Sequence, residues 1–188
     1  MLVDEIAAQI IADLDATDRL RRKHASFRNF ARKGPKEMGV FTEAMERIAR
    51  DLPAQIAGWS PVVEDPPDIE LTSGAQRIGV EITELVNPRA LKAQLDNSPR
   101  YTEELLHYGP DQAKAQLAEI VKAKEEKIRV VRSRYTAFAL LIHTDEPMLN
   151  SEMLSGHRLR PESEMYRWVY LLFSYEPTKN ECPLVRLQ

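Results

Sequence analysis

The stretch that decides the fold is PPDIELTSGAQRIGVEITELV, residues 66–86. Its second half alternates strictly, with Ile78, Val80 and Ile82 on one face and Gly79, Glu81 and Thr83 on the other. Alternation of this kind, with β-branched residues, predicts a strand over 77–85. Pro66-Pro67 leads into a second predicted strand over 68–72, and Ser73-Gly74 supplies a turn signal between the two. The stretch therefore predicts a β-hairpin.

The most compact hairpin pairs residues whose numbers add up to 149, which places Asp68 directly opposite Glu81. Opposed side chains share one face of the sheet and lie ~5 Å apart at Cβ. Two carboxylates at that separation repel each other, and a bound divalent cation removes the conflict. Hard oxygen ligands suit Mg²⁺, Mn²⁺ or Ca²⁺, so the hairpin predicts a metal site.

Outward from the hairpin, a helix around Thr42 is expected to end before Pro53, with Met45, Ile48, Ala49 and Leu52 on one face. A strand over 59–64 follows, and Pro61 suggests that it lies at a sheet edge. Residues 86–110 show no clear period and are expected to form a loop with at most one helical turn.

Beyond that loop, Asp111 is expected to cap a helix that runs to about Arg134. Its buried stripe is predicted to consist of Leu117, Ile120, Val121, Ile128 and Val131. The apolar run TAFALLIHT, from Thr136, predicts a strand buried on both faces. Segments 168–175 and 183–187 are predicted to form a C-terminal strand pair.

The N-terminal part has a different character. An amphipathic helix over 2–15 and a second helix over 17–33 are expected, the latter stopped by Gly34-Pro35. We therefore expect a helical extension over 1–36 and a domain over 37–188 with its core in 37–145. Residues 19–33 contain seven basic and no acidic residues, and the candidates for nucleic-acid binding are Arg21, Arg22, Lys23, Arg28, Arg32 and Lys33. The alternative is a solvated helix face.

Composition limits the choice of function. The chain has 188 residues, a net charge of −3 and one cysteine, Cys182, which excludes an internal disulfide framework. Its four histidines show no ligand spacing for zinc. No apolar run approaches the ~20 residues that span a bilayer, and the acidic start lacks the features of a secretory signal. We expect no membrane partner and a cytoplasmic location.

The segments PPDIEL and IGVEITELV, together with the predicted order of helix, three strands, helix and strand, resemble the PD-(D/E)xK (restriction-endonuclease-like) nuclease superfamily. The resemblance covers roughly residues 37–145. It implies an α/β fold, namely an αβββαβ core with a central mixed sheet flanked by helices. It further implies that Asp68, Glu81 and the Ile82 carbonyl hold Mg²⁺ or Mn²⁺, and that the activity is nucleic-acid hydrolysis, with DNA favoured over RNA.

The chain departs from the motif at one position, because Thr83 stands where the family has its lysine. A threonine hydroxyl can bond a water but supplies no positive charge. Some relatives take the lysine from the following helix, where Lys124 and Lys127 are candidates and the resemblance favours Lys127. The family also often places a glutamate on the first core helix, and Glu46 matches better than Glu43. The alternative for both lysines is that they flank the buried stripe and face solvent.

Two functions stay open at this point. One is a Mg²⁺-dependent nuclease that uses Asp68, Glu81, Thr83, Lys127 or Lys124, and Glu46. The other is a non-catalytic module on the same fold that binds nucleic acid or a protein, of the immunity or regulatory type. The missing motif lysine and the acidic balance of the chain permit the second function. A homodimer or another protein partner also stays open.

Overall fold

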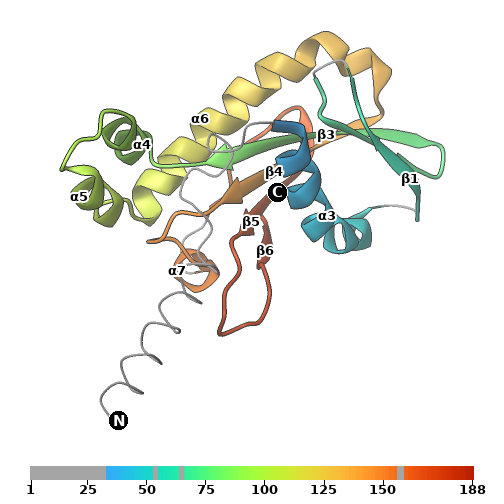
Figure 1. The fold of residues 1–188 in the computed structure, drawn as a ribbon. Helices are drawn as coiled ribbons and strands as arrows, with labels where there is room; N and C mark the ends of the chain where they lie inside the picture. The colour runs from blue at the N-terminus through green and yellow to red at the C-terminus, as the bar shows by residue number, and fades with distance from the viewer. Residues whose placement is uncertain (1–32, 53–54, 64–65, 156–158) are drawn as a thin grey trace.

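Six strands form one open sheet in which neighbours in the chain are also neighbours in space (Figure 1). The computed structural model describes residues 33–52, 55–63, 66–155 and 159–188. The strands are β1 (Ile56–Pro61), β2 (Ile69–Ser73), β3 (Gln76–Leu85), β4 (Ala137–Thr144), β5 (Tyr166–Phe173) and β6 (Leu184–Arg186). Neighbouring strands run antiparallel from β1 to β3, parallel from β3 to β5, and antiparallel from β5 to β6. The sheet is therefore mixed.

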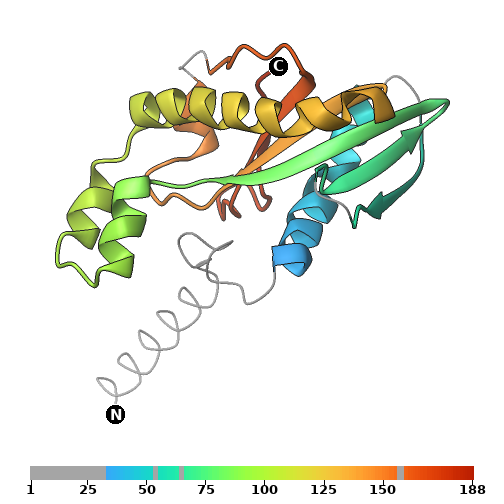
Figure 2. The same cartoon turned by 90° about the horizontal axis from the view of Figure 1, so that it is seen from above.

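Two long helices cover the two faces of this sheet (Figure 2). On one face, α3 (Lys33–Asp51) packs Phe41, Ala44 and Ile48 into a core that includes Val80 and Ile82 of β3. On the other face, α6 (Pro110–Ile128) packs Leu117, Val121 and Ile128 against β4 and β5. Since successive residues of a strand point to opposite faces, Glu81 lies on the α6 face. The architecture is an α/β sandwich of helix, sheet and helix.

Shorter helices complete the described chain. They are α4 (Pro88–Leu95), α5 (Tyr101–Leu106), the 3₁₀ helix η1 (Arg129–Arg134) and α7 (Ser151–Ser155). Among the described residues, no helix is long and apolar enough to cross a membrane.

Most predicted elements are confirmed. The hairpin, the helix over 111–134 and the strand from 136 all form, and the last 3₁₀ turns of that helix belong to η1. Strand β4 is buried on both faces, as a parallel strand between helix layers should be. Pro61 lies in the edge strand β1, where no neighbour needs its missing N–H. Strands β5 and β6 form the expected C-terminal pair, and the structure shows that they run antiparallel.

Three predictions were wrong in detail. Gly34 and Pro35 lie inside α3 instead of ending a helix, because a proline is tolerated in a first helical turn. Asp111 is not the N-cap of α6; the N-cap is Gly109, directly before the helix. Strand β5 lies parallel to β4 and is almost wholly buried, so the core of the sheet extends beyond residue 145.

The segment 86–110 was also mispredicted, since it contains α4 and α5 instead of a loop with one turn. The Asn87 Oδ1 atom accepts hydrogen bonds from Arg89 N and Ala90 N, which caps α4. Pro88 follows at the first helical position, where its fixed φ favours a helix. Helices of 8 and 6 residues are too short to show a hydrophobic period, which explains the error.

The predicted helices over 2–15 and 17–33 lie almost wholly outside the described residues. The basic candidates Arg21, Arg22, Lys23, Arg28 and Arg32 lie outside them as well, and Lys33 is the first residue of α3.

Candidate functional site

The register of the β2–β3 hairpin brings Asp68 and Glu81 together. Every pair of the ladder, from Ile69 with Val80 to Ser73 with Gln76, follows the predicted register, and Asp68 and Glu81 are the next residues beyond the ladder on the two sides. Asp68 Oδ2 accepts a hydrogen bond of 2.7 Å from Ile82 N, so its carboxylate takes the place of a main-chain acceptor just beyond the ladder. The predicted register is confirmed.

Pro67, directly before Asp68, can lie close to β3 because position 79 of that strand is a glycine. A Cβ atom on Gly79 would lie 2.8 Å from two ring carbons of Phe138 and 3.0 Å from Cγ of Pro67. Glycine therefore lets Pro67, and with it the adjoining Asp68, lie close over β3.

Helix α6 supplies the positive charge that faces this pair. The Lys124 ammonium donates to Glu81 Oε2 at 3.2 Å and to the Ile82 carbonyl at 3.3 Å. Lys127, one turn further, has its Nζ 3.9 Å from Glu81 Oε1. The Lys124 side chain is 14% exposed and that of Lys127 45%, whereas Glu81 is fully buried. Geometry thus favours Lys124 as the cation of the site, whereas the sequence favoured Lys127.

The Glu81 carboxyl is hard to ionise in this setting. Burial raises its pKa and the nearby Asp68 carboxylate raises it further, and the two lysines oppose them only in part, so that the pKa of Glu81 rises to about 7. Near neutral pH the carboxyl is therefore poised between its two forms. A cation that binds the charged form takes the place of the proton.

The oxygen atoms around the pair form a donor set that fits a hard divalent cation. Asp68 and Glu81 contribute carboxylates, and the Ile82 carbonyl points to the same place because Lys124 contacts it together with Glu81. Within the described residues Glu81 Oε1 is buried and accepts no hydrogen bond. A buried acceptor of this kind is costly unless a cation or a donor reaches it. No cluster of three metal-binding side chains occurs in the described part of the chain, so the carbonyl would complete the set.

Of two further predicted site residues, Thr83 lies on the face of the sheet that carries Glu81 and Glu46 does not. Thr83 is half-buried and lies two residues after Glu81, hence on the same face. Glu46 is exposed on α3, on the other side of the sheet from Glu81. The buried stripe of α3 contains Phe41, Ala44 and Ile48, and the helical period turns position 46 away from it. The structure therefore does not bring Glu46 to the pair.

Two residues that the sequence did not indicate, Tyr166 and Glu125, lie on the same side of the sheet as the Asp68–Glu81 pair. The Tyr166 hydroxyl is buried without a partner among the described residues, and burial, with Glu81, Glu125 and Asp68 nearby, raises its pKa. Glu125 Oε1 accepts hydrogen bonds from Ser163 Oγ at 2.5 Å, Glu164 N at 2.8 Å and Met165 N at 3.1 Å. These bonds tie α6 to the chain before β5. No sequence signal distinguishes either residue from an ordinary strand tyrosine or surface glutamate.

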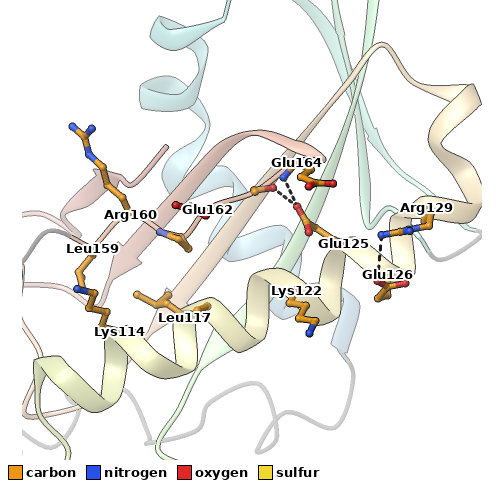
Figure 3. Close-up of a pocket in the computed structure, with 13 residues that line it drawn as sticks. Lys114, Leu117, Lys122, Glu125, Glu126, Arg129, Leu159, Arg160, Glu162 and Glu164 are labelled. Atoms are coloured by element: carbon orange, nitrogen blue, oxygen red, sulfur yellow. Dashed lines mark hydrogen bonds and ion pairs between the residues drawn. The ribbon is translucent and has the colours of Figure 1, made fainter.

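The pocket of about 670 Å³ beside α6 is not at this pair (Figure 3). It lies between α6 and residues 159–164, with Leu117 and Leu159 among its lining residues and charges of both signs around them. Its lining includes Lys122 and Glu125 and neither Lys124 nor Lys127. Positions 118, 122 and 125 form one stripe of α6, and the helical period places Lys127 on the far side from it. The mixed charge of the lining indicates no ligand class.

Comparisons of the chain with protein-family models, with curated proteins and with solved structures give no match.

Proposed function

We propose that the chain is a metal-dependent nuclease of the PD-(D/E)xK type, which hydrolyses phosphodiester bonds of DNA with Mg²⁺ or Mn²⁺. The observation that carries the proposal is the convergence of Asp68, Glu81, the Ile82 carbonyl and the Lys124 ammonium at one end of a hairpin. Two acids, one carbonyl and one lysine are the groups that the resemblance implies. The restriction-endonuclease-like form of the α/β fold is part of the same proposal.

In this proposal Asp68, Glu81 and the Ile82 carbonyl hold the cation. A bound Mg²⁺ would lower the pKa of a water ligand and offset the negative charge that builds up on the phosphate. Glu81 contributes its charged form, for which the cation displaces a proton. Deprotonation of Glu81 is thus linked to metal binding.

Lys124 takes the role of the motif lysine that Thr83 replaces. Its side chain reaches the pair from α6 and is only 14% exposed, so its charge is weakly screened by water. A fixed charge beside the phosphate stabilises the transition state more than the ground state, because negative charge grows during the reaction. Thr83, on the same face, can orient a water through its hydroxyl. Lys127 is more exposed and is suited to bind a neighbouring phosphate.

A second function is favoured by one contact. Lys124 Nζ already contacts Glu81 Oε2 and the Ile82 carbonyl, two of the three expected metal ligands. An ammonium group in that position can satisfy the acid by itself, as in a non-catalytic module that binds nucleic acid or a protein partner.

One experiment decides between the two functions. Linear and supercoiled DNA and single-stranded RNA are incubated with Mg²⁺ or Mn²⁺ and the wild-type chain, Asp68→Asn or Glu70→Gln. Glu70 lies two residues after Asp68, in β2, but pairs with Arg77 at 2.6 Å, so Glu70→Gln is the matched control. The nuclease predicts DNA cleavage by the wild type and by Glu70→Gln and none by Asp68→Asn. No cleavage of any substrate by the wild type would favour the non-catalytic module.

A further inference from the structure

The helical segment after Lys124 carries a row of basic side chains. This row is separate from the basic segment 19–33 that the sequence indicated for nucleic-acid binding. We define the η1 strip as Lys127, Arg129, Arg132, Arg134 and Arg77. Residues 127–134 contain four basic and no acidic residues. All five members of the strip are exposed.

The η1 strip is fixed to β3 at both of its ends, and one of these ends lies at the Asp68–Glu81 pair. At one end Lys127 Nζ lies 3.9 Å from Glu81 Oε1. At the other end Thr136 N donates to the Arg77 carbonyl at 2.8 Å, and Arg77 N donates to Thr136 Oγ1 at 2.7 Å. Figures 1 and 2 show the end of α6 and the turns after it lying over β3. The strip therefore runs along β3 from position 81 back to position 77.

Packing of side chains also holds the strip in place. The Arg77 guanidinium lies 5.3 Å from the ring centroid of Tyr135, and that ring packs on Phe138 at 5.3 Å between centroids. Val131, within η1, is buried in the core. Cationic groups on a rigid, packed segment lose less conformational entropy on binding than those on a mobile tail.

Acidic groups offset part of the charge of the strip. Arg77 pairs with Glu70 at 2.6 Å and Arg129 with Glu126 at 3.2 Å. The Arg129–Glu126 pair is exposed on both sides, so its net strength is low and a polyanion can compete for Arg129. Glu70 is 24% exposed and holds the exposed Arg77 side chain through two hydrogen bonds. Arg132 and Arg134 are exposed on the same turns of η1.

We propose that the η1 strip binds the backbone phosphates of the DNA strand whose phosphodiester bond lies at the Asp68–Glu81 pair. This inference rests on the proposed function. Four residues of β3 span about 13 Å, and one strand of a duplex carries one phosphate per 3.4 Å of helix axis, so the strip covers about four phosphates. Guanidinium groups bind phosphate oxygens in a bidentate manner, which suits the three arginines of η1.

The test measures binding and cleavage separately on one duplex. Binding of a fluorescent 20-base-pair DNA to the full chain is followed by anisotropy in EDTA over a series of salt concentrations. The test variant is Arg132→Ala/Arg134→Ala, and the matched control is Lys114→Ala/Lys122→Ala on the opposite side of α6. The logarithm of the association constant falls linearly with the logarithm of the salt concentration. We expect the magnitude of this slope to decrease by about 1.8 in the test variant, at about 0.9 per phosphate contact, and to stay within about 0.3 of wild type in the control.

An unchanged slope in the test variant, or an equal loss in the control, would overturn the assignment of the strip. Absence of DNA binding by the wild type, or competition by polyglutamate as strong as that by DNA, would also overturn it. Cleavage of the same duplex in Mg²⁺ separates the two proposals. A changed slope without wild-type cleavage keeps the strip and rejects the nuclease, and cleavage with an unchanged slope does the reverse.

Discussion

The Lys124 ammonium lies 3.2 Å from Glu81 Oε2, across 43 positions in the chain, and so links α6 to the hairpin that carries the acidic pair. The same ammonium donates to the Ile82 carbonyl at 3.3 Å. One lysine thus contacts both groups that β3 contributes to the candidate metal site. The position of this charge is set by the packing of α6, through Leu117, Val121 and Ile128, and not by the strand motif.

The first prediction concerns the rate of cleavage. Lys124→Ala should lower the single-turnover rate of DNA cleavage by about 10²-fold or more, and change the dissociation constant of DNA much less, because the charge acts on the transition state. Lys122→Ala removes a charge from an exposed position of the same helix and should leave the rate within about twofold. Equal rates for Lys124→Ala and wild type would exclude Lys124 from the reaction.

The same Lys124→Ala variant should also lose stability in a pH-dependent way. At pH 8 Glu81 is mostly charged, so removal of its buried partner should lower the free energy of unfolding by about 1 kcal/mol more than at pH 5, because without Lys124 the carboxyl takes up a proton. At pH 5 the Glu81 carboxyl is already protonated, and the loss should be smaller. Urea denaturation at both pH values measures the difference. A loss that is the same at pH 5 and pH 8 would mean that Lys124 stabilises the fold through its methylene groups alone.

The third prediction concerns Glu81 itself. Its folded-state pKa of about 7 lies above the ordinary value of 4.5, so the protonated form stabilises the fold. This stability is present in full below pH 4.5 and is lost as the pH rises to about 7, a change on the order of 3 kcal/mol. Relative to wild type, Glu81→Gln should therefore gain stability from pH 4.5 to 7 in urea denaturation.

Glu70→Gln provides a control of opposite sign. The hydrogen bond from Arg77 holds the pKa of Glu70 below its ordinary value, so its carboxylate stabilises the fold above that ordinary value and loses this effect as the pH falls. The Glu70→Gln variant should match wild type at low pH and be less stable at neutral pH. If Glu81→Gln followed the Glu70→Gln profile, the raised pKa of Glu81 would be refuted.

The fourth prediction tests the close packing before Asp68. Gly79→Ala would place its Cβ 2.8 Å from the Phe138 ring and should cost about 1–3 kcal/mol of stability, since either Phe138 or Pro67 must move. Gly58→Ala in β1, where no atom lies within 4 Å of the added Cβ, should change stability by less than about 1 kcal/mol. Thermal denaturation of both variants checks the contrast, and similar losses in the two would count against the packing argument.

The hairpin was predictable from sequence because alternation and a turn signal fix its register locally. The pairing of Asp68 with Glu81 follows from Ser73-Gly74 and the period of two, without knowledge of distant contacts. Helix α6 and strand β4 were predictable for similar reasons, since a long helix and a long apolar strand carry strong periodic or compositional signals.

The choice between Lys124 and Lys127 could not be made from sequence. Both residues border the buried stripe of α6, and the rotation of that helix over the sheet depends on distant packing, including the bonds from Glu125 to residues 163–165. The prediction that Glu46 lies at the site was wrong for a related reason. Met45 and Ala49 suggested one buried face of α3, whereas Phe41, Ala44 and Ile48 form the deepest stripe.

The measurement that tests the central claim most directly is calorimetric titration of Mn²⁺ into the wild-type chain at pH 8, with Asp68→Asn, Glu81→Gln and Glu70→Gln beside it. The account predicts one Mn²⁺ bound per wild-type or Glu70→Gln chain and none in the other two variants. It also predicts about 30-fold weaker binding to wild type at pH 5.5, because a proton then occupies Glu81. Absence of Mn²⁺ binding to the wild type, or unchanged binding by Asp68→Asn and Glu81→Gln, would contradict the claim that this pair is a metal site.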